Sequence, residues 1–168
     1  EVNKYTITKQ QMFTDIFKYI SYLVELVKPK HLLYLAVDGV APRAKQNQQR
    51  QRRFVGAQEQ KSVLESDIDN GREYKYKFDS NTITPGTRWM EELSRQLELY
   101  IRKQMSENYL WRHLNVIYSD HLVPGEGEHK IMQHIRHSKM QINYNPNTRH
   151  CIYGLDADLI ILSLVSHE

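Results

Sequence analysis

Residues 31–39, HLLYLAVDG, join a continuous apolar run to a turn. The run over 31–37 is too continuous for a half-exposed strand, so it predicts a strand buried on both faces. Asp38 and Gly39 are turn residues and place the end of this strand. Two further apolar runs, 114–118 and 151–153, predict two more strands downstream.

Segments with helical spacing of apolar residues flank these strands. A capping-box pattern of Thr8 and Gln11 begins a helix that ends before Pro29. Further helices are predicted over about 44–61, from Pro85 through TRWMEELSRQLELYIRKQM, after the turn at 124–125, and over 156–165. A polar loop is expected over 65–77. The resulting order, α-β-α-α-β-α-β-α, predicts one α/β domain over 1–168, with a parallel sheet flanked by helices.

Composition restricts the class of protein more than its partners. The 168 residues suit one domain, and a net charge of +3 says little about what the chain binds. The lone Cys151 excludes an internal disulfide, fits a reducing compartment and is predicted to be a small buried residue. No apolar run approaches the ~20 residues needed to cross a bilayer, so no membrane association is predicted. Both ends are expected to be incomplete, because the chain lacks an initiator Met and stops after an apolar run.

Five acidic residues follow predicted strands or a turn signal. They are Asp38, Glu126, Glu128, Asp156 and Asp158. The carboxyl ends of parallel strands meet at one edge of a sheet, where ligands bind. Carboxylates gathered there repel one another unless a cation neutralises them. Hard oxygen ligands without Cys or His indicate Mg²⁺ or Mn²⁺ rather than zinc.

Each acidic site also has a simpler interpretation. Asp38 before a glycine could be a turn residue only. Glu126 and Glu128 could be solvated glutamates at a helix N-terminus. Asp158 could cap the last helix, which would leave Asp156 without a role, and at least one of these two aspartates is expected to be partly buried. The three sites taken together favour the metal interpretation.

A basic segment, APRAKQNQQRQRRF, lies between the first acid and the others and contains no Asp or Glu. On its predicted helix one face carries Lys45, Gln49, Arg52 and Arg53. This face could surround a terminal phosphate, with the arginines making bidentate contacts. The alternative is a solvated charged face, although such a face normally mixes both signs of charge. Arg43 and Arg50 could hold backbone phosphates or have no role.

Other candidate motifs fail. The histidines 129, 134 and 137 lack zinc-site spacing and are predicted to lie on the surface. No Walker A loop, Gly-x-Ser-x-Gly elbow or His-Glu-x-x-His motif occurs. Trp89 lies on an apolar helical stripe and is predicted to be core. Trp111 is open between the core and stacking on a base.

At these residues the chain resembles the Xrn/Rat family of 5′→3′ exoribonucleases. The resemblance runs nearly continuously over 34–168, whereas 1–30 agrees mainly in pattern. Four blocks in the family's order carry it: YLAVDGVAPRAKQNQQRQRRF, FDSNTITPGT, VPGEGEHKIMQHIR and NPNTRHCIYGLDADLIIL. The blocks VPGEGEHK and GLDADL look closer to the cytoplasmic branch of the family than to the nuclear one.

The resemblance implies a nuclease core related to PIN and flap-nuclease domains. It also implies Mg²⁺-dependent hydrolysis of single-stranded RNA that bears a 5′-monophosphate, with release of mononucleotides. The five acids match the family's metal-binding positions. Lys45, Gln49, Arg52 and Arg53 match its pocket for the 5′-phosphate. A cytoplasmic location is expected, with the nucleus as the alternative, and protein partners are not indicated.

The chain departs from the family pattern at both ends. Family members begin with a Gly-rich segment and a first strand that carries another catalytic Asp, and a further acid and the base-stacking aromatics should lie beyond Glu168. Two alternatives therefore stay open. The chain could be a catalytically incomplete fragment that binds RNA 5′ ends, or part of a flap-type DNA nuclease.

Overall fold

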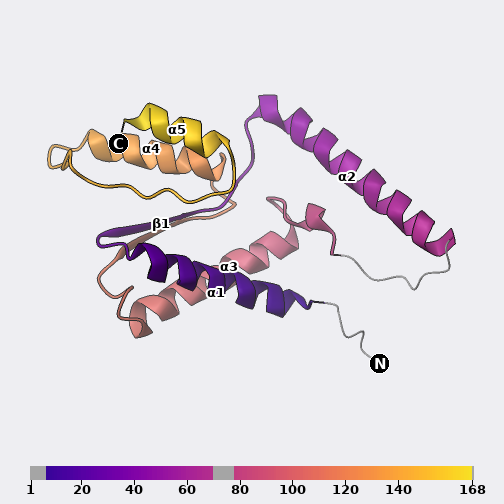
Figure 1. Cartoon of the computed structure of the whole chain (residues 1–168), viewed down its shortest axis with the longest axis horizontal. Helices are drawn as coiled ribbons and strands as arrows, with labels where there is room; N and C mark the ends of the chain where they lie inside the picture. Colours follow the sequence, from indigo (N-terminus) through magenta and orange to yellow (C-terminus); the bar gives the residue numbers. More distant parts are fainter. Residues whose placement is uncertain (1–6, 70–77, 168) are drawn as a thin grey trace.

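A computed structural model of the chain describes residues 7–69 and 78–167 (Figure 1). Its elements are α1 (Lys9–Val27), β1 (Leu32–Ala36), α2 (Arg43–Asp69), the 3₁₀ turn η1 (Ser80–Thr82), α3 (Arg88–Glu107), β2 (Asn115–Ser119), α4 (Gly127–Lys139) and α5 (Asp158–Ser166). Figure 1 shows α1 and α3 on one side of the strands, α4 and α5 on the other, and α2 projecting away. The predicted α/β fold is confirmed.

The sheet consists of β1 and β2, which pair in parallel. The register places Leu32 opposite Asn115 and Ala36 opposite Ser119. Alternate side chains point to opposite faces of a strand. Leu33 and Leu35 therefore pack on the α1–α3 side, whereas the ring of Tyr34 contacts His134 of α4 with centroids 5.0 Å apart. The predicted parallel sheet with helices on both faces is thereby confirmed.

The main core lies between the sheet, α1 and α3. Its buried residues are Val24, Leu97, Ile101 and Trp111. Trp111 has no exposed surface, so it belongs to the core and is not free to stack on a base. Trp89 packs edge-to-face on Phe13 of a second cluster, with ring centroids 5.4 Å apart, which confirms its predicted place in the core.

Helix ends follow local capping chemistry. The hydroxyl of Thr8 accepts the N–H of Gln11 at 3.2 Å, as the capping pattern predicts, and α1 ends at Val27 before Pro29. Thr87 caps α3 in the same way, so this helix begins after the Pro85–Gly86 turn. α2 extends to Asp69, so the first part of the predicted loop over 65–77 is helical. The rest of that prediction, 70–77, lies outside the described residues.

Two predictions from apolar runs are wrong. Residues 151–153 form no strand, because neither β1 nor β2 pairs with them within the described chain, and Cys151 is exposed rather than buried. The first strand is also less covered than predicted. None of the residues of β1 is fully buried, and Leu32 is 36% exposed.

The membrane prediction can be compared with the helices. Over 7–69 and 78–167, none of them combines the length and the apolar character needed to cross a bilayer.

The burial of Leu97 predicts a large effect of its truncation. Leu97→Ala should lower the free energy of unfolding by about 2–5 kcal/mol, because it leaves a cavity between α1, α3 and the sheet. Leu99→Ala, on the same helix but 53% exposed, should change it by less than about 0.5 kcal/mol. Urea denaturation of both variants measures the difference. Equal effects would contradict this packing.

Candidate metal centre and anion pocket

The loops that follow β1 and β2 are held together by main-chain hydrogen bonds. The N–H of Val37 donates to Ser119 O, and Gly39 N–H donates to Gly125 O, each at 2.9 Å. A Cβ at Gly39 would lie only 1.9 Å from the carbonyl oxygen of Val123, so this close approach requires glycine. The approach brings Asp38 beside the turn that carries the next acids.

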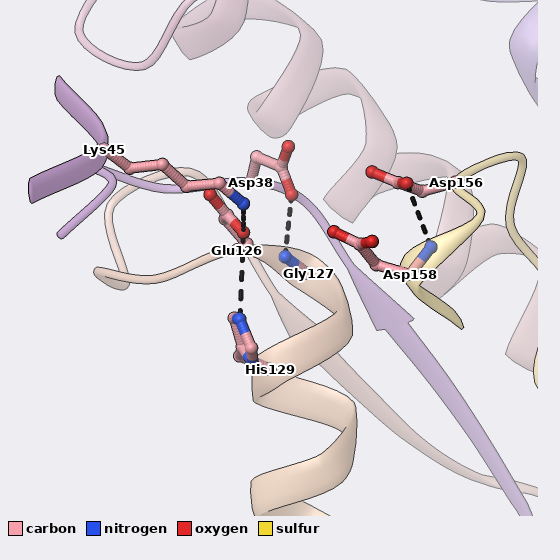
Figure 2. A network of polar contacts seen from close by, with 7 residues as sticks. All are labelled: Asp38, Lys45, Glu126, Gly127, His129, Asp156 and Asp158. Atoms are coloured by element: carbon pink, nitrogen blue, oxygen red, sulfur yellow. Dashed lines mark hydrogen bonds and ion pairs between the residues drawn. The ribbon is translucent and has the colours of Figure 1, made fainter. Parts of the chain in front are cut away.

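Glu126 is the buried member of the acidic set. It stands just before α4 and is 6% exposed. Its Oε2 accepts a hydrogen bond from Lys45 Nζ at 2.7 Å and lies 3.8 Å from Nε2 of His129 (Figure 2). A buried carboxylate needs a partner of opposite charge. Lys45 of α2 therefore faces the acidic residues.

Asp38 fixes the start of α4. Its Oδ1 accepts the N–H of Gly127 at 2.7 Å, as the dashed line in Figure 2 shows. The free N–H groups at a helix N-terminus favour a negative charge there. Within the described chain, Oδ2 of Asp38 has no hydrogen-bond partner, so one carboxylate oxygen remains for another ligand.

Asp156 and Asp158 lie at the start of α5. Oδ1 of Asp156 accepts the N–H of Asp158 at 3.2 Å, and Ala157 is the N-cap of α5, so Asp158 does not cap this helix. Both side chains are exposed, and the prediction that one would be partly buried is wrong. The reason is that 151–153 forms no strand, which leaves the following turn at the surface.

Ligand atoms from these segments converge in two groups that share Glu128. Oxygens of Glu128, Asp156 and Asp158 all lie within 4.8 Å of one another. The same limit holds for Glu126, Glu128 and His129. Among the described residues Asp38 belongs to neither group. Four of the five predicted acids therefore belong to one or the other of these groups, and the three carboxylates of Glu128, Asp156 and Asp158 are hard oxygen donors that fit Mg²⁺ or Mn²⁺.

Burial and neighbouring negative charges both act on the carboxyl group of Glu128. Burial raises the pKa of this carboxyl group, and the charges of Asp156 and Glu126 raise it further. The hydrogen bond to Glu126 in turn raises the pKa of Lys45. A divalent cation would relieve the same repulsion, so the electrostatics of the site suit a metal ion.

Sequence reasoning missed two residues here. His129 is exposed, as predicted, yet it stands one helical turn from Glu126 and offers a ligand atom to the first acids. Lys130 is 5% exposed, and its Nζ donates to the carbonyl oxygens of Val37 and Asp120, each at 2.8 Å. No local pattern indicated this role, because both partners of Lys130 are main-chain oxygens outside α4.

A cavity of about 250 Å³ opens between α2 and the turn before α3. Gln49, Arg50 and Arg53 line it, together with Gly39, Val40, Ala41, Gln46, Thr84 and Pro85. Arg53 donates to the amide oxygen of Gln49 at 3.4 Å. We refer to this cavity as the anion pocket, because its charged lining is entirely basic.

The predicted basic face is thus divided between two places. Gln49 and Arg53 line the anion pocket, whereas Lys45 contacts the acids and Arg52 is exposed and outside the lining. Arg50, which sequence analysis left without a definite role, lines the pocket instead. No described side chain of α2 is buried, so its basic groups are accessible to a ligand.

The contact between Lys45 and Glu126 predicts the effect of removing it. Lys45→Met should tighten Mn²⁺ binding roughly three- to tenfold. The substitution removes a positive charge that repels the cation and competes with it for Oε2 of Glu126. Lys61→Met, on the exposed surface of the same helix, should leave binding unchanged. Isothermal titration with Mn²⁺ measures both. Weaker binding by Lys45→Met would contradict this arrangement.

Known proteins resemble the whole chain. The family described as "XRN 5'-3' exonuclease N-terminus" matches residues 1–168. "5'-3' exoribonuclease 1" of Schizosaccharomyces pombe is 54% identical over 161 residues, which is 95% of this chain and 12% of that protein. The human protein of the same name is 47% identical over 166 residues, 98% of this chain and 10% of the relative. "5'-3' exoribonuclease 2" of Arabidopsis thaliana is 49% identical over 173 residues, 96% of this chain and 17% of the relative.

The chain therefore spans about a tenth to a sixth of the length of these relatives. The family match over the whole chain and the level of identity agree with the resemblance that its sequence blocks carry. The chain belongs to the XRN 5′-3′ exonuclease family and corresponds to the N-terminal part of its members.

Proposed function

We propose that the protein that carries this chain hydrolyses single-stranded RNA stepwise from a 5′-monophosphate end and releases mononucleotides. The observation that carries the proposal is the convergence of Glu128 with Asp156 and Asp158, beside the Lys45 contact. The names of the relatives support it, since they are called 5′-3′ exoribonucleases. Requirement for Mg²⁺ or Mn²⁺ is part of the proposal.

The acids would hold the metal in this reaction. When bound, Mg²⁺ supplies neutralisation of the charge on the scissile phosphate and a lower pKa for water. The ligands would be Asp38, Glu126, Glu128, Asp156 and Asp158. Glu128 is shared by both groups of ligand atoms, so it would be central to the site. Asp38 would contribute through Oδ2, because its Oδ1 accepts the N–H of Gly127.

The anion pocket would bind the 5′ end. A terminal monophosphate could accept hydrogen bonds from Arg50, Arg53 and the amide of Gln49, and the pocket is bounded by Pro85 and the main chain after β1. Lys45 lies on the same helix, α2, and contacts Glu126. It would bind the same phosphate or the next one. Arg52 remains a predicted phosphate ligand on the exposed side of α2. Phosphate contacts carry no base information, so little sequence preference is expected.

The branch of the family bears on location. Relatives named exoribonuclease 1 are 54%, 52% and 47% identical, whereas those named exoribonuclease 2 are 46–49% identical. We propose the first branch and a cytoplasmic location, which imaging of the tagged protein tests. A nuclear signal would favour the second branch.

Removal of metal or of the shared ligand should abolish activity. With 5′-monophosphorylated RNA, the whole protein should release mononucleotides in Mg²⁺, stop in EDTA and recover when Mg²⁺ is restored. Glu128→Gln should lower kcat by about 10²–10³-fold, because several kcal/mol of transition-state stabilisation depend on the metal. Glu98→Gln, on the exposed face of α3, is the control. Equal turnover in EDTA would exclude a metal-dependent nuclease.

Recognition of the 5′ end should depend on the anion pocket. Arg53→Ala should reduce the preference for 5′-monophosphate over 5′-hydroxyl RNA by about 10–100-fold, because one charge-assisted hydrogen-bond donor to the phosphate is lost. Arg102→Ala, which removes the same charge from the exposed face of α3, should keep the preference. Competition between the two RNAs in one reaction measures it.

The same assays separate the alternatives. Tight binding of 5′-phosphorylated RNA without turnover in Mg²⁺ would indicate a non-catalytic RNA 5′-end binding protein. Preference for branched DNA over single-stranded RNA would indicate a flap-type nuclease.

A further inference from the structure

Lys130 is a buried lysine that contacts no substrate-binding group. It lies in the first half of α4 and is 5% exposed. Lysine is almost never buried to this extent unless its ammonium group is paired. The burial of Lys130 therefore requires partners for its ammonium group.

The partners of the ammonium group are main-chain carbonyls. Lys130 Nζ donates to Val37 O and to Asp120 O, each at 2.8 Å. Val37 precedes Asp38 directly, and Asp120 directly follows β2. One side chain therefore ties α4 to the ends of both strands, next to Asp38 in the sequence.

A second contact connects the same elements in the opposite direction. The N–H of Gly127, the first residue of α4, donates to Asp38 Oδ1 at 2.7 Å. Asp38 thus holds the N-terminus of α4, and Lys130 holds the helix one turn later. Together with the buried side chains of Met132 and Ile135, these two attachment points restrict rotation of α4 about its own axis. Glu126 and Glu128 move with that rotation.

We propose that Lys130 is a positioning residue that holds Glu126 and Glu128, at the start of α4, in place for cation binding. The proposal rests on the proposed function only in that the acids bind a divalent cation. Lys130 does not itself reach the substrate, because its ammonium group is buried and bonded to main-chain oxygens. It acts through the helix that presents the glutamates.

The sign of one measurement distinguishes positioning from simple electrostatics. A lysine that merely repels the metal would, when neutralised, allow tighter cation binding, as expected for Lys45→Met. Neutralising a lysine that positions the ligands would weaken cation binding, because the carboxylates lose their common geometry. The two roles therefore predict opposite shifts in affinity.

The test compares Lys130→Met and Lys130→Gln with Lys45→Met in the whole protein. Titration calorimetry with Mn²⁺ should show about tenfold weaker binding for Lys130→Met, a smaller loss for Lys130→Gln, which keeps one donor group, and tighter binding for Lys45→Met. Lys103→Met on the exposed face of α3 should bind as the wild type does. Unchanged or tighter binding by Lys130→Met would overturn the proposal, as would a wild type that binds no Mn²⁺.

Folding and catalysis provide the remaining controls. Circular dichroism must show native helix content for both variants, and kcat on RNA should fall while KM is retained, since the anion pocket is unchanged. If both variants unfold, NMR of the wild-type protein tests the proposal instead. Its slowly exchanging lysine ammonium signal should shift in step with Mg²⁺ saturation, and a constant signal would overturn the proposal. Mn²⁺ binding without RNA cleavage would refute the proposed function alone.

Discussion

The parallel pairing of β1 and β2 is the constraint on which the site depends. The ladder from Leu32–Asn115 to Ala36–Ser119 is extended by the Val37–Ser119 hydrogen bond and by the bonds between the loops at Gly39 and Gly125. The segments that follow β1 and β2 leave the sheet at the same edge, because the two strands run in the same direction. Asp38 and the first turn of α4 are thereby brought into contact.

Charge balance at this edge comes from three elements. α4 and the start of α5 supply carboxylates, and burial together with the charges of Asp156 and Glu126 raises the pKa of Glu128. Lys45 of α2 compensates the buried Glu126, whereas Lys130 bonds the main-chain carbonyls of Val37 and Asp120 at the strand ends. A cation that binds here would replace contacts of Lys45 but not those of Lys130, since only Lys45 bonds a carboxylate. The two lysines therefore have different chemical roles.

Local pattern was a good guide to α1, α3 and the two paired strands. Thr8 caps α1 as predicted, because capping chemistry is set by adjacent residues. The strand predicted over 151–153 failed for a different reason. A strand exists only where a neighbour accepts its hydrogen bonds, and no periodicity reports that neighbour. Cys151, Asp156 and Asp158 are exposed because this segment does not join the sheet.

The sequence by itself determined which side chains are available: five carboxylates at turn positions, a helix of basic residues without acids, and the blocks that identify the family. Only the tertiary structure decided how they are divided. Lys45 bonds Glu126, Arg50 rather than Arg52 lines the anion pocket, and Lys130 is buried. The physical reason is range. Capping and periodicity act over a few residues, whereas an ion pair depends on the distance in space between residues far apart in the chain.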